Sequence, residues 1–374
     1  MSGTGDEIAQ ASPRVWLLLA EKLGDNAQVL ALAAALPWPC ETRNIRMKSD
    51  FQMGKPRFRP GLDHLDEGAS DELAAPWPDI VITIGRRAAM VALWIKERSP
   101  STRIVLVGRP KRWLERFDLV ISPPQFRLPD AENVFQLQLP LMRADPGRVA
   151  EAARQWRSRL ESMPRPLTAV LVGGQTQPFR FDADAAGELA RRLSTSIEQD
   201  GGSLFVTTSR RTGPIVVDTL ASRIRPPSRI FRFGIDHAED NPYQALLGLA
   251  DRFVVTGDSV SMQVEVLGLG KPLAIFPLPL SRKPHVRLWR AAGRLLEPGA
   301  PIGECLRRAG ISGFVRDLSG FHEQLYRDGL AVPLGQPFRQ PAHDIADEVD
   351  EAASRVVALL NTGAHGGPTG LPVD

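Results

Sequence analysis

Twice along the chain, short apolar runs that end in Gly, Ser or Thr alternate with amphipathic stretches of helical period. This alternation is typical of βα units, whose strands pair in parallel and are covered by helices. The first block runs from about Pro13 to Pro140, and the second begins at Thr168. We therefore predict an α/β protein with two Rossmann-like, doubly wound domains that face each other across a cleft and hold a ligand there.

The length of 374 residues fits two domains, since one domain usually takes about 100–200 residues. We expect a linker helix between the two blocks and a closing helix after them, with small, polar, Gly/Pro-rich tails that are disordered. In chain order the expected parts are a tail over 1–12, the N-terminal domain over 13–146, the linker helix over 147–166, the C-terminal domain over 167–335, the closing helix over 341–361 and a tail over 362–374.

The apolar runs predict the strands. In the first block these are Val15–Leu19, Thr42–Arg46, Ile80–Ile84, Ile104–Val107, Leu119–Ile121 and Val134–Leu139. In the second block they are Thr168–Val172, Ser203–Thr207, Arg229–Phe233, Phe253–Thr256 and Leu273–Phe276. Helices are predicted over Ala27–Leu36, from after Ile84 through Arg98, and over 147–161, Ala183–Glu198, Pro214–Arg223, Val260–Leu267 and Asp344–Leu360. Residues 47–79 give no clear pattern, and 280–330 look mostly helical and loop-rich.

Charge and cysteine usage narrow the class of protein. The formal net charge is +3, which fits an anionic ligand or membrane surface and fits equally a general preference for Arg over Lys. Nucleic-acid binding calls for a concentrated basic stripe, and the chain has none, so we expect no nucleic-acid partner. Cys40 and Cys305 lie in different predicted domains, without metal-ligand or disulfide spacing, which suits a reducing cytosol.

The start of the chain and its apolar runs bear on location. The first ten residues lack a basic stretch followed by an apolar core, so we expect no secretory signal. No apolar run approaches the roughly 18–20 residues that span a bilayer. We expect a cytoplasmic protein, with peripheral contact at the inner membrane left open, as is the oligomeric state.

Polar residues follow the first predicted strand, where a doubly wound sheet binds its ligand. Gly24 permits a tight turn, and Asp25 or Asn26 can cap the following helix. An alternative role makes Asp25 a carboxylate at the cleft mouth that accepts a proton from an attacking hydroxyl, with Gln28 as a neighbouring polar contact.

Two more strands of the first block are followed by Gly-Arg. Gly85 precedes Arg86 and Arg87, and Gly108 precedes Arg109. Two Arg residues at a helix start oppose the helix dipole. We therefore interpret Arg86 and Arg109 as contacts for an anionic ligand.

The second block has similar strand ends. Gly173 and Gly174 follow one strand, and paired glycines let the backbone approach a ligand closely. Ser209 and Arg210 follow the next strand, in a segment of hydroxyls and two Arg residues that suits a diphosphate.

The most informative stretch follows the run Phe253–Thr256. It supplies a turn, hydroxyls and backbone N–H groups at a helix start, where phosphate binds favourably. Glu265, one to two turns into that helix, could accept both hydroxyls of a ribose. The predicted ligand contacts here are Gly257, Asp258, Ser259, Ser261, Met262 and Glu265.

Several other chemistries lack their sequence signals. Asp182 and Asp184 resemble the Asp-x-Asp of metal-dependent glycosyltransferases, but both open a predicted helix and are explained as N-cap and first-turn charges. No other cluster has metal-ligand spacing. A nucleophile turn, a Walker loop and a complete Gly-x-Gly-x-x-Gly are also lacking. We expect no metal and no cofactor.

Seven segments together resemble the bacterial relatives of the plant mitochondrial-fission ELM proteins. They span about residues 15–280 in family order: Gly24–Gln28, Gly85–Arg87, Gly108–Pro110, Val172–Gly174, Thr207–Thr212, Asn241–Tyr243 and Val255–Met262. Ser259–Glu265 also looks like the donor-binding segment of the peptidoglycan N-acetylglucosaminyltransferase, in which a helix carries a ribose-binding Glu that maps to Glu265. That enzyme has a longer Gly-rich first loop with a His, and here Asp25 stands in its place.

The resemblance implies a GT-B-like fold and a metal-independent glycosyltransferase. Its donor is a nucleotide-diphosphate sugar held by the C-terminal domain, and Asp25 is the candidate base for an unknown acceptor, for which an envelope glycan or a lipid-linked molecule is one option. Two alternatives stay open. One is a non-catalytic adaptor, as the plant relatives suggest, and the other is a nucleotide-sugar epimerase of the same architecture.

Overall fold

The computed structural model describes residues 12–21, 23–53, 58–142, 144–176, 178–225, 227–281, 316–343 and 348–361. These residues form two compact units. The first unit holds the described residues up to Leu141 together with 348–361. The second holds those from Met142 to Ser281 and from Arg316 to His343.

The first unit is built on a six-stranded parallel sheet in the order β2-β1-β3-β4-β5-β6. Val15 pairs with Cys40 on one side and with Ile80 on the other, which sets the register of the central strand. The strands are β1 (Val15–Leu19), β2 (Cys40–Asn44), β3 (Ile80–Ile84), β4 (Arg103–Val107), β5 (Leu119–Ser122) and β6 (Val134–Gln136). The inner strands are near-continuous Val, Ile and Leu runs, because helices bury both faces of the sheet.

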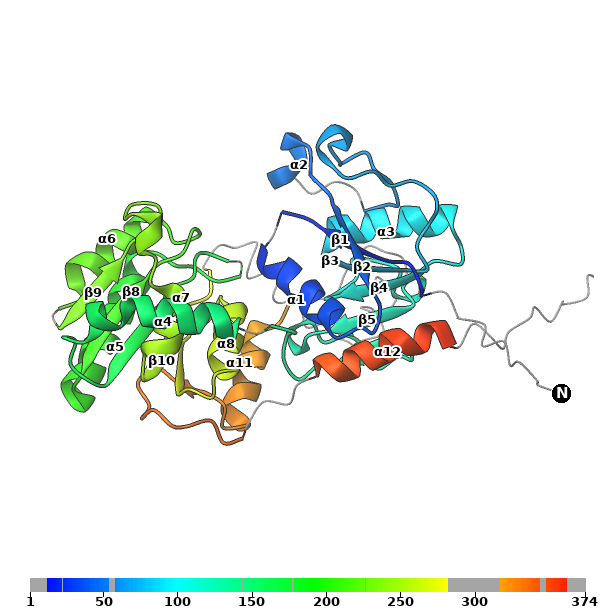
Figure 1. Ribbon diagram of the computed structural model, residues 1–374. Helices are drawn as coiled ribbons and strands as arrows, with labels where there is room; N and C mark the ends of the chain where they lie inside the picture. Colours follow the sequence, from blue (N-terminus) through cyan, green and yellow to red (C-terminus); the bar gives the residue numbers. More distant parts are fainter. Residues whose placement is uncertain are drawn as a thin grey trace, which may run out of the picture. The chain divides into compact units, whose positions relative to one another are not determined.

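Helices cover both faces of this sheet (Figure 1). Because successive side chains of a strand point to opposite faces, Trp16 and Leu18 join the core formed with α3, whereas Val15 and Leu17 join the core formed with α1 and α12. The helices of the first unit are α1 (Leu23–Ala34), α2 (Ser49–Met53), α3 (Arg86–Arg98) and α12 (Val349–Asn361). Helix α12 packs beside α1, so the chain returns to the first unit at its C-terminal helix.

The second unit repeats the design, with a six-stranded parallel sheet in the order β12-β11-β10-β7-β8-β9. Its strands are β7 (Leu167–Leu171), β8 (Ser203–Thr207), β9 (Ser228–Phe231), β10 (Arg252–Thr256), β11 (Leu273–Phe276) and β12 (Val332–Pro333). Its helices are α4 (Pro146–Leu160), α5 (Ala183–Asp200), α6 (Pro214–Arg223), α7 (Tyr243–Leu249), α8 (Val260–Leu267) and α11 (Leu318–Arg327).

The predicted fold class, α/β with two doubly wound parallel sheets, is confirmed. All eleven predicted strands are present, with ends shifted by a few residues at most. Three of the described α-helices and strands escaped prediction: the five-residue helix α2 in the stretch without a clear pattern, α7, whose seven residues are too short and too uniformly apolar to show a helical period, and the two-residue strand β12. The 280–330 stretch is described only in part, where it contains α11.

The predicted linker helix is α4, and it is an integral part of the second unit. It begins after Asp145, whose side chain accepts hydrogen bonds from the N–H groups of Gly147 and Arg148. It packs against α7, where Gly248 lies against Ala153. The predicted tails 1–12 and 362–374 lie outside the described residues, apart from Ser12.

Each sheet reverses its strand order beside its first strand. From β1 the chain adds β2 on one side and then β3 to β6 on the other, and from β7 it adds β8 and β9 on one side and then β10 to β12 on the other. Ligands of open parallel sheets bind beyond the carboxyl ends of the strands at this reversal. The points to inspect are therefore the ends of β1 and β3, and the ends of β7 and β10.

Candidate functional site

Three loops of the second unit meet at the carboxyl ends of β7, β8 and β10, and Asp258 ties them together. Its carboxylate accepts hydrogen bonds from the Gly174 N–H at 2.9 Å and from the Thr256 hydroxyl at 2.7 Å. The Arg211 guanidinium lies 3.7 Å away. Asp258 is only 2% exposed. Burial raises the pKa of its carboxyl group, and the hydrogen bonds and Arg211 oppose that rise.

Gly173 and Gly174, which are predicted ligand contacts, both lie against other parts of the protein. The Gly173 N–H donates to Thr256 Oγ1 at 2.8 Å and the Gly174 N–H to Asp258, so both amides are engaged inside the protein. A Cβ at Gly173 would fall on the Asp258 carboxylate, and one at Gly174 on the Arg211 backbone, both closer than 3.0 Å. Gly173 is therefore needed beside the Asp258 side chain and Gly174 beside the Arg211 backbone, and their approach to a ligand stays a prediction.

The loop after β8 is held by Thr212. Its hydroxyl accepts from the Ser209 N–H at 2.8 Å and donates to the Gly173 carbonyl at 2.6 Å. The Ser209 hydroxyl lies 3.1 Å from the same Thr212 oxygen. Arg211 reaches Thr176 Oγ1 at 2.9 Å. Arg210 and Arg211 are both exposed, and Arg211 is the one that contacts Thr176 and Asp258.

Helix α8 starts at the same edge with its first turn open. Ser259 is its N-cap residue and makes no side-chain capping hydrogen bond. Gly257 and Ser259 are buried, whereas Ser261 and Met262 in the first turn are partly exposed. The first N–H groups of a helix have no partner within the helix and carry its positive dipole end. This end of α8 can therefore accept an anion.

Glu265 lies further along α8 and is largely buried. Its Oε2 accepts a hydrogen bond of 2.7 Å from the hydroxyl of Tyr243, the first residue of α7. Burial raises the pKa of the Glu265 carboxyl, and the Tyr243 hydrogen bond opposes the rise. Sequence reasoning noted Tyr243 only as part of a family motif, because it did not predict α7.

His322 of α11 is a residue that sequence reasoning missed. It is 6% exposed and packs under the loop after β10, where a Cβ at Gly257 would lie 2.9 Å from His322 Cε1. Burial lowers the pKa of His322 to about 4, so the imidazole is neutral at physiological pH. Its position in a region without a recognisable pattern left no sequence signal.

In the first unit, the residues after β1 are helical rather than a loop. Helix α1 begins at Leu23, so Gly24, Asp25 and Asn26 lie in its first turn, which corrects the prediction of a turn capped by Asp25 or Asn26. Asn26 Nδ2 instead donates to the Ala20 carbonyl at 2.6 Å and ties the helix start to the end of β1. Gln28 is 9% exposed. Asp25 is partly exposed near the strand reversal of this sheet.

Positive charge gathers at the neighbouring strand ends. Arg86 is the first residue of α3, whose first turn contains no acid. Burial and the neighbouring Arg87 and Arg112 lower the pKa of Arg86, as expected where cations crowd. After β4, the Arg109 guanidinium lies over the Phe126 ring, 5.1 Å from its centroid. Arg86 thus lies at the strand reversal, and Arg109 lies one strand further along.

Comparison with known proteins gives the family. The family model described as mitochondrial fission ELM1 matches residues 23–300. The chain belongs to the mitochondrial fission ELM1 family. It is 25% identical over 298 residues to an uncharacterized protein of Rickettsia prowazekii, covering 71% of this chain and 83% of that one. It is 28% identical over 221 residues to the mitochondrial fission protein ELM1 of Arabidopsis thaliana, covering 53% of this chain and 51% of that one.

Solved structures resemble the chain only in outline. The UDP-GlcNAc 2-epimerase of Methanocaldococcus jannaschii matches with a TM-score of 0.48 and 12% identity, over 94% of this chain and 100% of that one. A calicheamicin glycosyltransferase matches with a TM-score of 0.45 and 14% identity, over 94% of this chain and 99% of that one. Neither similarity says what this chain binds.

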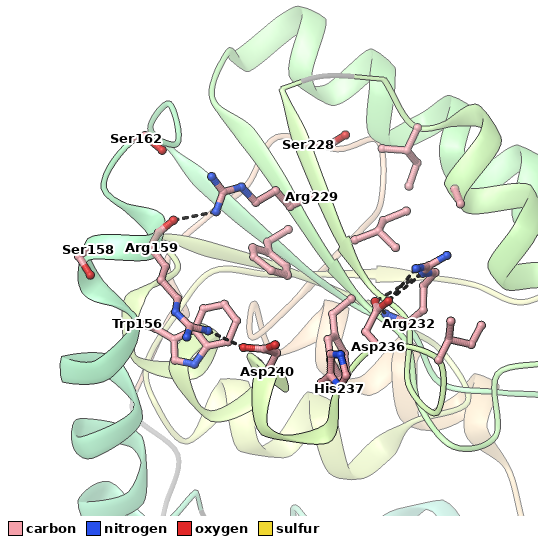
Figure 2. A pocket seen from close by; sticks show the side chains of 16 residues that line it. Trp156, Ser158, Arg159, Ser162, Ser228, Arg229, Arg232, Asp236, His237 and Asp240 are labelled. Atoms are coloured by element: carbon pink, nitrogen blue, oxygen red, sulfur yellow. Dashed lines mark hydrogen bonds and ion pairs between the residues drawn. The ribbon is translucent and has the colours of Figure 1, made fainter.

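An open groove of about 1090 Å³ lies elsewhere in the second unit, along the outer edge of β9 (Figure 2). Two ion pairs lie in it, Arg159 with Asp240 and Arg232 with Asp236, each at 2.7 Å, and Arg229 donates to the Arg159 carbonyl. None of the ligand contacts predicted from the sequence lines this groove. The predicted contacts that belong to the second unit lie instead at the carboxyl ends of β7, β8 and β10.

Two further observations concern metals and membranes. Within the described ranges, no group of three or more His, Cys, Asp or Glu side chains is arranged to hold a metal ion. Nor is any described helix long and apolar enough to cross a bilayer.

Proposed function

We propose that the second unit binds the nucleoside diphosphate of a sugar nucleotide at the carboxyl ends of β7 and β10, and that the protein transfers the sugar to an acceptor. The observation that carries this proposal is the placement of α8. One helix presents an N-terminal turn without a side-chain cap at the strand reversal and, along the same helix, a partly buried carboxylate. The first suits phosphate and the second suits ribose hydroxyls.

The roles of the chain's residues follow from that placement. The diphosphate lies against the first turn of α8, at Ser259, Ser261 and Met262, with Arg210 supplying an exposed cation. Glu265 accepts hydrogen bonds from the ribose. Asp258 acts indirectly, because its hydrogen bonds hold the loops after β7 and β10 in place.

In the transfer itself, an acceptor hydroxyl forms a bond to the anomeric carbon while the bond from that carbon to the diphosphate oxygen breaks. The diphosphate leaves with the bonding electrons, and the helix dipole and Arg210 offset its growing charge without a metal ion. The hydroxyl proton passes to a carboxylate, for which Asp25 is our candidate. Arg86 and Arg109 suit an anionic acceptor, such as one carried by an envelope glycan or a phospholipid at the membrane surface.

Calorimetry with UDP tests the donor site, using Glu265→Ala and a matched control, Glu198→Ala. Glu198 lies exposed near the end of α5. Loss of hydrogen bonds to a charged group costs about 1.5–3 kcal/mol, so Glu265→Ala should bind UDP about 10- to 150-fold more weakly, while Glu198→Ala binds as the wild type does. Equal affinity of both variants would sink the assignment of Glu265.

A non-catalytic adaptor is the second candidate, and the family's link to mitochondrial fission favours it. A protein that binds no nucleotide from a panel of UDP, GDP, ADP and dTDP sugars, but forms a stable complex with another protein, would support this role. Product analysis separates the remaining alternative, because an epimerase returns a changed sugar nucleotide in the absence of any acceptor.

A further inference from the structure

The contact between Tyr243 and Glu265 joins two helices at the proposed nucleotide site. The Tyr243 hydroxyl donates to Glu265 Oε2 at 2.7 Å. Tyr243 is itself fixed, because it begins α7 and its N–H donates to Asn241 Oδ1 at 3.0 Å. The tyrosine ring is rigid and partly buried, so its hydroxyl is a preset donor rather than a flexible one.

The contact with Tyr243 uses one of the two carboxylate oxygens of Glu265. Among the described residues, Oε2 accepts from Tyr243, and no side chain or backbone group donates to Oε1. A glutamate side chain has three rotatable bonds, so an untethered carboxylate would lose rotamer freedom on binding. The tether lets Oε1 face a ligand with less loss of freedom.

The surroundings also set the charge of the pair. Burial raises the pKa of Glu265 and raises that of Tyr243 well above its ordinary value, so the tyrosine stays protonated and donates. Of the charged or titratable groups in the described residues, Tyr243 is the one that acts on Glu265. Lys271, beside the C-terminal end of α7, donates hydrogen bonds to the carbonyls of Gly248 and Ala250.

We infer that Tyr243 is a positioning residue of the nucleotide site: it holds the Glu265 carboxylate with one oxygen toward the ribose, so that the site selects ribonucleoside over 2′-deoxyribonucleoside diphosphates. The inference rests on the proposed function, because it assumes that Glu265 meets a ribose. Beyond that function, the inference specifies that the ligand is a ribonucleotide and that Tyr243 acts on it through Glu265.

The test compares UDP with 2′-deoxy-UDP by calorimetry between pH 5 and pH 8, in the wild type, Tyr243→Phe and Tyr326→Phe. Tyr326 is the matched control: it is the other of the two tyrosines in the chain, lies on α11 of the same unit, and burial raises its pKa to about 12. The wild type and Tyr326→Phe should prefer UDP by about tenfold or more, as expected for a hydrogen bond to a charged group.

Tyr243→Phe should reduce this preference at least about threefold at pH 7, with little change in 2′-deoxy-UDP affinity. Without the hydroxyl donor the pKa of Glu265 rises further, so the carboxylate is neutralised at a higher pH. The loss of UDP affinity on acidification should therefore begin at a higher pH than in the wild type. A residue that only supported the fold would weaken both nucleotides alike and would not move this pH profile.

A second measurement, by fluorine NMR, leaves the hydroxyl group of Tyr243 in place. In Tyr326→Phe protein grown with 3-fluorotyrosine, position 243 carries the one fluorine label, and its NMR resonance should shift with UDP more than with 2′-deoxy-UDP. Equal shifts, or an unchanged UDP preference in Tyr243→Phe, would overturn the inference while leaving the proposed function standing. A wild type that binds neither nucleotide would overturn both, and one that binds them equally would overturn the ribose role of Glu265.

Discussion

Replacing Gly174 by Ala tests whether the paired glycines serve internal packing or ligand approach. The added Cβ would come closer than 3.0 Å to the carbonyl oxygen, carbonyl carbon and Cβ of Arg211, a separation that Cβ atoms essentially never show. Two of these three atoms are backbone, in a loop that Thr212 ties to Gly173. The clash therefore cannot be relieved by swinging a side chain away.

The size of the effect follows from this geometry. Overpacking of a well-packed region costs typically 1–3 kcal/mol and occasionally more, and a clash with tethered backbone belongs at the upper end, at about 3 kcal/mol. For a domain of this size, 1 kcal/mol corresponds to roughly 2–4 °C, so the melting temperature of the second unit should fall by about 6–12 °C. No ligand is needed for this loss.

Gly213→Ala is the matched control, because it lies in the neighbouring loop with nothing within 4 Å of an added Cβ and with an ordinary φ of −69°. Its stability should stay within about 0.5 kcal/mol of the wild type. Differential scanning calorimetry of the ligand-free proteins gives both values. A Gly174→Ala protein as stable as Gly213→Ala would refute the packing argument and would return Gly174 to a role in ligand approach.

Two further predictions concern His322 and Thr212. Burial lowers the pKa of His322 from 6.5 to about 4. As the pH falls below 6.5, His322 is therefore protonated in the unfolded chain but stays neutral in the folded chain, which favours unfolding. Folding stability should therefore drop by roughly 2 kcal/mol between pH 7.5 and pH 5 on account of this residue. In chemical unfolding, the stability of His322→Gln should fall by roughly 2 kcal/mol less than that of the wild type over the same pH range. Identical pH dependence of the two proteins would contradict the buried neutral imidazole. Thr212→Val leaves the Ser209 N–H and the Gly173 carbonyl without their partner, and should cost about 1–3 kcal/mol. Thr219→Val, whose hydroxyl bonds only to the Ile215 carbonyl of its own helix, should cost less than about 0.5 kcal/mol in the same unfolding experiment.

The strands were predictable because of how a parallel sheet is buried. A strand such as Ile80–Ile84 or Leu167–Leu171 is covered on both faces, so its sequence is a short, continuous apolar run. The strand ends were predicted to within a few residues, as for β2, which is Cys40–Asn44 against the predicted Thr42–Arg46. The doubly wound class was predicted, whereas the order of the strands, and with it the point of strand reversal in each sheet, comes from the structure.

The helix starts were harder to predict. Helix α1 begins at Leu23, ahead of Gly24 and Asn26, although glycine and asparagine are poor helix formers. The hydrogen bond from Asn26 to the Ala20 carbonyl compensates locally. The start of α1 is thus set by a contact with the strand end, which propensity alone does not contain.

The sequence by itself determined the two parallel sheets and the loops at which polar residues gather. It also determined that a helix carries Glu265 one to two turns beyond one of those loops. Only the tertiary structure decided which of these polar groups form hydrogen bonds to one another inside the protein. Asp258 and the Gly174 amide lie 84 residues apart and bond to each other, and Tyr243 reaches Glu265 from a helix that shows no periodicity. Local patterns report which faces are buried, because burial selects apolar residues position by position. Hydrogen-bond partners from distant strands leave no such pattern, because any polar residue at the right point in space can serve.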